Sequence, residues 1–134
     1  KISLCELPSI YLASGEGRGL GTRYLKHLER AKLIFLVLDL KSEFAKNLKE
    51  GYKILLETIE KFNPDFLKIP RFVVVNKSDL LSKADLKKKT FSAKEKVCFI
   101  SAKENSGIDR LMKDAQKKLG RQPYEAVGLE RTRL

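Results

Sequence analysis

The sequence predicts an open α/β fold in which a mainly parallel sheet is flanked by helices. Four short apolar runs, at residues 2–5, 33–38, 72–75 and 97–100, show no alternation of apolar and polar side chains. This pattern is typical of strands that are covered on both faces. Segments with helical periodicity lie between the runs. The alternation of strands and helices favours βαβ units, whose ligands bind beyond the carboxyl ends of the strands.

Three stretches carry apolar side chains at helical spacing. The first runs from about residue 20 to residue 32, with leucines expected inward and charged side chains outward. The second is expected to end before the Asn63-Pro64 turn. The last is expected to begin at Ser106, with Asp109 three residues later, and to stop at Gly120. The apolar stripe of the second helix consists of Leu48, Tyr52, Leu55, Ile59 and Phe62.

The composition fits one globular domain. The chain has 134 residues, of which 43% are hydrophobic and 34% are charged. We expect residues 1–120 to form this domain and the aperiodic residues 121–134 to form a linker or a flexible tail. No apolar run approaches the roughly 18 residues of a membrane span, so no membrane partner is expected. Cys5 and Cys98 lie inside apolar runs, which fits reduced core thiols and a cytoplasmic location.

The positive charge is concentrated in the second half of the chain. Residues 68–134 hold 17 basic and 8 acidic side chains, against 11 and 9 in residues 1–67. Such an excess suits the phosphate backbone of RNA, but a solvated lysine-rich surface explains it equally well. The charge pattern supports an RNA hypothesis and indicates no specificity for DNA.

Asn76-Lys77-Ser78-Asp79 directly follow the third apolar run, at the expected carboxyl edge of the sheet. A carboxylate there can accept hydrogen bonds from two adjacent N–H groups of guanine, whereas adenine presents a ring acceptor at the matching place. A site built on such paired bonds rejects the wrong base, because an unpaired charge is costly. We expect Asp79 to select guanine, Lys77 to cover one purine face and Asn76 to tie the loop to neighbouring backbone.

Ser101-Ala102-Lys103 follow the fourth apolar run. The Ala102 N–H is expected to donate to the guanine carbonyl oxygen, and Lys103 to cover the ring edge. Either loop alone is compatible with a polar turn, but the two together after consecutive strands predict guanine recognition. Asp39 and Glu43, which follow the second apolar run, are interpreted as capping or solvated side chains.

The two loops resemble the guanine-specificity motifs of the P-loop GTPases, and residues 6–30 narrow the resemblance to the Obg family. Glu6-Leu7-Pro8-Ser9 is similar to the switch II segment Asp-x-Pro-Gly, and the glycine-rich residues 15–21 lead into a similar helix. The resemblance covers about residues 2–120. It implies GTP or GDP with Mg²⁺ as ligands, and slow GTP hydrolysis in assembly of the large ribosomal subunit, with that subunit or its rRNA as partner.

The sequence departs from the Obg pattern on the phosphate side. It contains no Gly-x-x-x-x-Gly-Lys-Ser/Thr loop and no Gly-Lys dipeptide, so the amides and the lysine that hold the β and γ phosphates are missing. Glu6 replaces the Asp that contacts Mg²⁺ through water in the family, and Ser9 replaces the Gly that meets the γ-phosphate. We therefore expect an incomplete Ras-like fold, without the P-loop and switch I portion, and weakened metal binding.

In the resembled fold, the strand that leads to the phosphate loop lies between the strand at residues 2–5 and that at residues 33–38. Residues 33–38 are therefore expected to have an unpaired edge. Three alternatives for covering it remain open, and we expect the first of them. They are another part of a longer polypeptide, residues 2–5 themselves, or a partner.

Two main functions are compatible with these residues. The first is the guanine-nucleotide-binding portion of an Obg-like GTPase. We expect these 134 residues alone not to hydrolyse GTP, because base recognition does not position the γ-phosphate. The alternative is a ribosome- or RNA-binding pseudo-GTPase without nucleotide turnover. A third possibility is a part of a fold with no activity of its own.

Overall fold

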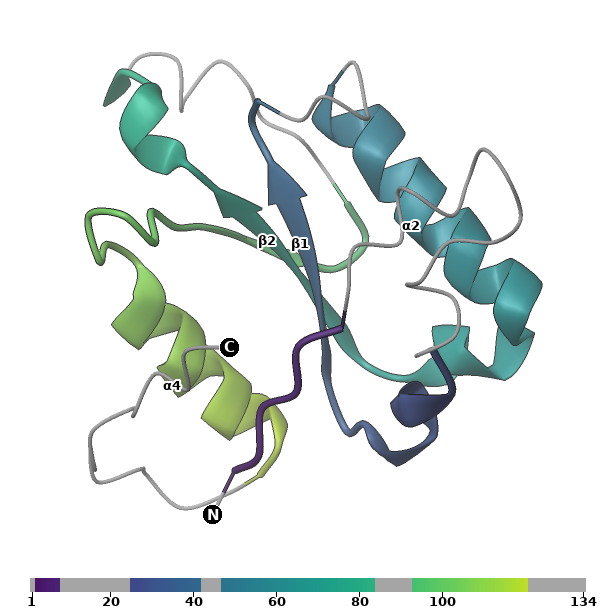
Figure 1. Cartoon of the computed structure of the whole chain (residues 1–134). Coiled ribbons are helices and arrows are strands. Elements are labelled where there is room, and N and C mark those ends of the chain that lie inside the picture. The colour runs from purple at the N-terminus through teal and green to yellow at the C-terminus, as the bar shows by residue number, and fades with distance from the viewer. Residues whose placement is uncertain (1, 8–24, 42–46, 84–92, 121–134) are drawn as a thin grey trace.

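The computed structural model describes residues 2–7, 25–41, 47–83 and 93–120 of the chain (Figure 1). In these residues, the parallel strands β1 (Ile34–Asp39), β2 (Arg71–Asn76) and β3 (Lys96–Phe99) form a three-stranded sheet in the order β1-β2-β3. Helices α2 (Leu48–Phe62) and α4 (Ile108–Lys118) lie on opposite sides of the sheet (Figure 1). The predicted α/β fold with an open parallel sheet is confirmed.

Each face of the sheet has its own apolar core. Alternate side chains of a strand point to opposite faces, so an uninterrupted apolar run supplies both cores at once. Leu55 and Ile59 of α2 pack in one core, and Leu111 and Ala115 of α4 pack in the other. The strand residues on the α2 side include Leu36, Leu38, Val73 and Val75, and those on the α4 side include Phe72 and Val74.

Helix α2 forms where the apolar stripe predicts it. Its N-terminus is capped by Asn47, whose Oδ1 accepts a hydrogen bond of 2.9 Å from the Glu50 N–H. The helix ends at Asn63, which is extended and in turn caps the short 3₁₀ helix η3 (Pro64–Lys68) through the Asp65 N–H at 3.0 Å. The Asn63-Pro64 turn therefore stops the helix as expected, because the residue before a proline disfavours the helical conformation.

Helix α4 begins after Gly107, not at Ser106. Ser106 instead pairs with Ser101 through two backbone hydrogen bonds of 3.0 Å. Gly107 has a φ of +77°, and a Cβ on it would lie 2.6 Å from the Phe99 carbonyl oxygen. The close approach of this glycine to the end of β3 sets the start of the helix. Gly120, with a φ of +67°, follows the C-cap residue Leu119, as the expected stop signal requires.

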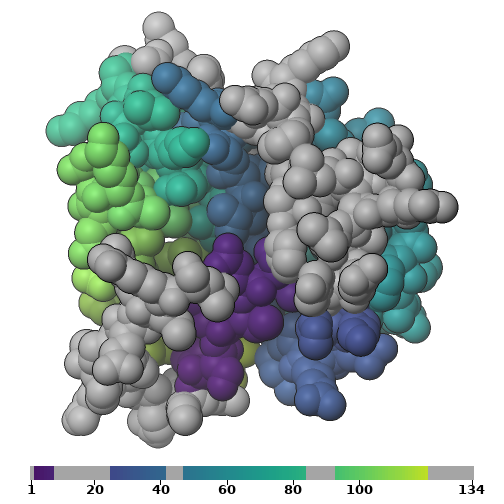
Figure 2. Space-filling model, viewed as in Figure 1, coloured from purple at the N-terminus to yellow at the C-terminus, as the bar shows by residue number. Residues whose placement is uncertain are grey.

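The strand expected at residues 2–5 is not formed, so that prediction is wrong. Residues 2–7 have no regular secondary structure and lie on the surface (Figure 2). Leu4 is 69% exposed, and Cys5 is exposed as well, so its prediction as a core thiol is also wrong. An apolar run becomes a strand only where a neighbour pairs with its backbone, and the sequence pattern does not report that neighbour.

Strand β1 has β2 as its single strand neighbour within the described residues. The unpaired edge expected at residues 33–38 is therefore present in this part of the chain, and Val37 is 54% exposed. Of the helix expected near residues 20–32, Leu25–Arg30 form the 3₁₀ helix η2, with Leu25 and Leu28 buried. Residues 20–24 lie outside the described residues. No helix in the described ranges is long and apolar enough to cross a membrane.

A polar cluster joins the amino-terminal part of β2 to α2 and to the segment before β3. The Arg71 guanidinium donates to Glu95 Oε1 from Nε at 3.1 Å and from a terminal nitrogen at 2.9 Å. The Tyr52 hydroxyl donates to Glu95 Oε2 at 2.5 Å. The Arg71 and Glu95 side chains are only 14% and 8% exposed. This cluster fixes the positions of two strands at the end opposite their carboxyl termini.

Candidate functional site

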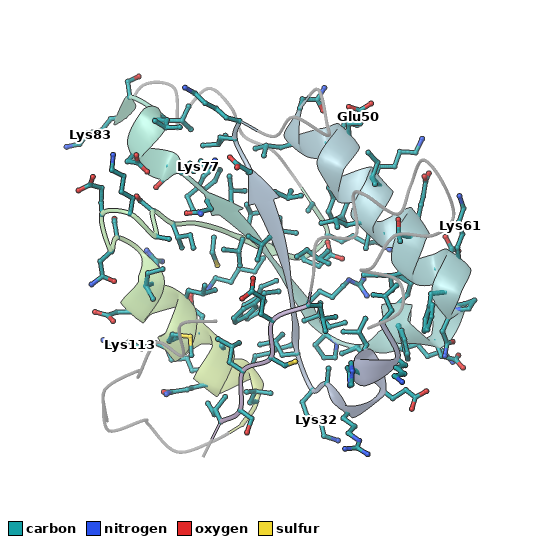
Figure 3. All side chains as sticks on the ribbon, in the orientation of Figure 1. Lys32, Glu50, Lys61, Lys77, Lys83 and Lys113 are labelled. Carbon is teal, nitrogen blue, oxygen red and sulfur yellow. The ribbon has the colours of Figure 1, made fainter. Side chains whose placement is uncertain are left out.

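The segments that follow the three strands surround one cavity of about 330 Å³, near the lower end of the roughly 300–1,000 Å³ of small-molecule sites. Asp39 of β1 is level with Asn76 of β2 in the sheet register. Because the carboxyl ends of parallel strands meet at one edge, residues far apart in sequence gather there. Figure 3 shows Lys77 at this edge and Lys32 at the opposite end of β1. The lining residues are Lys41, Asn76, Lys77, Asp79, Leu80 and Lys103.

The turn after β2 is set by the backbone of Lys77. This residue has a φ of 66° and a ψ of 32°, in the left-handed region, which is uncommon for a residue other than glycine. The 3₁₀ helix η4 (Ser78–Leu80) begins immediately after it. The Ser78 N–H donates to the Ile100 carbonyl oxygen at 3.0 Å. The turn therefore directs the chain after β2 against the chain that leaves β3.

Asp79 is held by Ser101. The Ser101 hydroxyl donates to Asp79 Oδ1 at 2.6 Å, and its oxygen accepts a hydrogen bond of 3.1 Å from the Glu104 N–H. Ser101 is 1% exposed, whereas Asp79 is exposed at the cavity. Within the described residues, no further hydrogen bond to Asp79 is found. The buried serine therefore fixes the carboxylate while leaving it accessible to a ligand.

Asn76 connects the same two loops through their backbone. Its Oδ1 accepts a hydrogen bond of 3.0 Å from the Ala102 N–H, so it ties its loop to neighbouring backbone as expected. The Ala102 N–H is also the donor that the sequence assigns to a guanine carbonyl oxygen. For that role, the base oxygen must replace the Asn76 oxygen as acceptor or share the N–H with it.

Lys77 forms an ion pair with Asp39. Its Nζ lies 2.5 Å from Asp39 Oδ2, and the Lys41 N–H donates to Asp39 Oδ1 at 2.8 Å. Partial burial opposes ionisation of Asp39, but the hydrogen bonds from Lys77 and from the Lys41 amide outweigh it, so the pKa of this carboxyl lies below its ordinary value. Interpreting Asp39 as a capping or solvated side chain missed its pairing with Lys77. Glu43 lies outside the described residues.

Two of the lining residues, Lys41 and Leu80, were not predicted. Lys41 comes two residues after the end of β1, and Leu80 ends η4. Both residues follow the carboxyl end of a strand, and this position in the sequence already indicates that they lie at the ligand-binding edge of the sheet. By contrast, Lys103 lines the cavity as a predicted site residue, while Ser101 lies buried behind Asp79.

The described residues do not fit a protein-held metal site. They contain no group of three or more histidine, cysteine, aspartate or glutamate side chains that could hold a metal ion. Glu6 does not line the cavity, and Ser9 lies outside the described residues. The Asp79 carboxylate, which lines the cavity, is engaged by Ser101, and the Asp39 carboxylate is engaged by Lys77.

The chain is similar to proteins named GTPase Obg from several bacteria. It is 32% identical over 120 residues to that of Buchnera aphidicola subsp. Schizaphis graminum, covering 85% of this chain and 36% of the relative. The relative from Syntrophomonas wolfei is 33% identical over 123 residues, covering 91% and 29%. The relative from Cytophaga hutchinsonii is 35% identical over 111 residues, covering 81% and 32%. No protein-family model matches the chain.

The chain thus spans about a third of the length of the curated relatives that it matches. The match covers most of this chain, including both loops at the cavity, and the neighbouring parallel strands β2 and β3 carry these loops. The resemblance predicted from the motifs is confirmed: over most of its length, this chain is similar to the Obg GTPases.

Proposed function

We propose that the chain binds a guanine nucleotide, GTP or GDP, with the base in the cavity at the carboxyl ends of the strands. The observation that carries this proposal is the Asp79 carboxylate, which lines the cavity and is held by the buried Ser101 at 2.6 Å. A fixed carboxylate matches two adjacent donors of guanine and meets a ring acceptor in adenine. The name of the relatives, GTPase Obg, supports the proposal.

Each loop residue has a distinct task in this proposal. Asp79 accepts the two guanine N–H groups, and the base excludes water from it once bound. The Ala102 N–H, from which Asn76 Oδ1 accepts a hydrogen bond in the free chain, donates to the guanine carbonyl oxygen and shares its hydrogen between the two acceptors. The stem of Lys77 covers a purine face because Asp39 fixes its ammonium. Lys103 covers the ring edge from the segment after β3.

We further propose that this chain by itself does not accelerate GTP hydrolysis appreciably. The 134 residues contain no Gly-Lys dipeptide, and holding the base neither positions nor stabilises the γ-phosphate in the transition state. For Glu6 and Ser9, a role in contacting Mg²⁺ and the γ-phosphate rests on the resemblance to the switch II segment alone. Because the described residues offer no metal cluster, Mg²⁺ enters this proposal only as an ion carried by nucleotide phosphates.

The proposed nucleotide binding is tested with Asp79→Ala and a fluorescent GDP analogue. We expect the variant to bind roughly 10- to 100-fold more weakly, because a charged hydrogen-bonding partner is lost. Asp109→Ala removes an exposed carboxylate from α4 and serves as the matched control with unchanged affinity. Equal affinity of the wild-type chain for GDP and ADP, or full GDP affinity in Asp79→Ala, would contradict the proposal.

A second candidate function is contact with rRNA during assembly of the large ribosomal subunit, in the cytoplasm. It is favoured by the exposed side of α4, where four basic side chains face solvent alongside a single acidic one, Asp109. Asp114 on the same helix is neutralised by Lys96 at 2.6 Å. This surface suits a phosphate backbone. The exposed basic residues are Arg110, Lys113, Lys117 and Lys118.

A further inference from the structure

The cavity wall on the β1 side carries a lysine to which neither the sequence motifs nor the proposed base contacts give a role. Lys41 lines the cavity together with Lys77, Lys103 and Asp79. Three lysines against one carboxylate give the lining a positive balance. A neutral purine nucleoside does not neutralise this positive charge, whereas the phosphates of a nucleotide carry negative charge.

Of the lining lysines, Lys77 already has a carboxylate partner. Its ammonium pairs with Asp39 Oδ2 at 2.5 Å. Lys41 is exposed, and among the described residues no carboxylate forms an ion pair with its side chain. An ammonium at a cavity wall without an acidic neighbour is suited to an anionic group of a ligand, because the two charges attract each other without breaking an existing pair.

A hydrogen bond from the backbone of Lys41 to Asp39 holds Lys41 at the cavity. The Lys41 N–H donates to Asp39 Oδ1 at 2.8 Å, and the other oxygen of Asp39 is bound to Lys77. The chain leaving β1 is therefore anchored to the loop that follows β2. Asp39 acts here as a positioning residue, since it holds the backbone of Lys41 without lining the cavity itself.

The order of the strands sets the direction in which a bound nucleotide extends. Asp79 and Lys103 follow β2 and β3, whereas Lys41 follows β1 on the other side of β2. Neighbouring strands lie about 4.8 Å apart, so the β1 and β3 ends are separated by roughly 10 Å. A nucleotide that keeps its base against Asp79 and stays within the cavity therefore brings its sugar and phosphates toward Lys41.

We infer that the Lys41 ammonium binds the phosphates of a guanine nucleotide whose base lies against Asp79. This inference rests on the proposed function and adds a phosphate contact to it. Lys41 contributes charge attraction and leaves the choice of base to Asp79. The chain thus distinguishes a nucleotide from a nucleoside through the segment after β1, and guanine from adenine through the segment after β2.

The test compares GDP with guanosine as ligands of the full, isotope-labelled chain in nuclear magnetic resonance titrations. The wild-type chain is expected to bind GDP more tightly than guanosine. Lys41→Ala should weaken GDP binding about three- to tenfold, as expected for a partly exposed charged contact, and leave guanosine binding unchanged. Lys32→Ala is the matched control, because Lys32 is an exposed lysine at the opposite end of β1 (Figure 3).

The outcomes separate this inference from the proposed function. Equal affinities of the wild-type chain for GDP and guanosine, or equal losses for both ligands in Lys41→Ala, would overturn the phosphate contact and leave base recognition intact. A loss in Lys32→Ala as large as that in Lys41→Ala would also overturn it, since general charge would then be the cause. If the wild-type chain binds neither ligand, the proposed function and the phosphate contact fail together.

Discussion

Ser101 donates a hydrogen bond of 2.6 Å to Asp79 across 22 positions of the sequence. The serine is buried at the end of β3, and the aspartate is exposed after β2. Since the Ser101 oxygen also accepts from the Glu104 N–H at 3.1 Å, its hydroxyl hydrogen is directed to the carboxylate. One side chain therefore orients the residue that the proposed function uses to read the base.

Removing this hydroxyl should weaken ligand binding more than it weakens the fold. Ser101→Ala is expected to lower GDP affinity about threefold to tenfold, because Asp79 then lacks the hydrogen bond that orients it. The loss should be smaller than that in Asp79→Ala. Fluorescent GDP titrations of both variants provide the measurement, and Ser82→Ala, an exposed serine beyond η4, is the control. An unchanged affinity in Ser101→Ala would show that Asp79 needs no support.

Gly107 and Gly120 offer a matched pair for testing backbone strain. Both have positive φ values, +77° and +67°, but only at Gly107 would a Cβ meet backbone, at 2.6 Å from the Phe99 carbonyl oxygen. Gly120→Ala is expected to cost about 1 kcal/mol of unfolding free energy through its φ alone. Gly107→Ala should cost roughly 2–4 kcal/mol, because the clash adds to the strain. Urea unfolding measures both, and equal costs would rule out the contribution of the clash.

The Arg71, Glu95 and Tyr52 cluster should stabilise the fold. Glu95 is 8% exposed and accepts hydrogen bonds from both partners. Glu95→Ala leaves the Arg71 charge without its carboxylate, which is expected to cost about 3 kcal/mol of unfolding free energy. Glu57→Ala, which breaks the exposed pair between Lys53 and Glu57, should cost less than about 1 kcal/mol. Urea unfolding of the two variants measures the difference, and similar losses would show that burial adds nothing.

The same cluster predicts a loss of stability at both extremes of pH. Burial opposes ionisation of Glu95, but hydrogen bonds from Tyr52 and Arg71 outweigh it and lower its pKa from 4.5. The stabilisation is present above pH 4.5 and is lost as the pH falls through the lower pKa of the folded state. Burial and the Glu95 charge raise the pKa of Tyr52 from 10.0 to about 12. The corresponding stabilisation is therefore present below pH 10 and is lost as the pH rises toward 12.

Unfolding free energies measured from about pH 3 to about pH 11 in wild type and in Tyr52→Phe check this dependence. The phenylalanine variant lacks the ionisable hydroxyl, so its alkaline loss should be smaller than that of the wild type. An identical alkaline profile for the two proteins would exclude Tyr52 as its source.

The basic side of α4 gives a prediction for the RNA candidate. Replacing Arg110, Lys113 and Lys117 together with alanine should weaken binding to double-stranded RNA. The slope of log affinity against log salt should fall by about 1 for each basic side chain that no longer binds a phosphate. The matched control replaces three exposed lysines of α2, Lys49, Lys53 and Lys61. Equal effects of both triple variants would show general attraction, with no defined surface on α4.

The amino-acid sequence was sufficient to predict the strands at residues 33–38, 72–75 and 97–100, because apolar runs without alternation require burial on both faces. It also determined the α2 stripe, since the spacing of these side chains places them on one side of a helix. The sequence also predicted that the loops carrying Asp79 and Ser101 lie close together, because the carboxyl ends of parallel strands share one edge of the sheet.

The folded chain sets which of these residues have partners. It pairs Asp39 with Lys77, places Lys41 at the cavity, starts α4 after Gly107 and leaves residues 2–5 without a strand. Apolar spacing reports that a side chain is buried. Strand pairing, ion pairs and the close approach of Gly107 to Phe99 depend on distances between segments remote in sequence, and those distances exist only after the sheet has assembled.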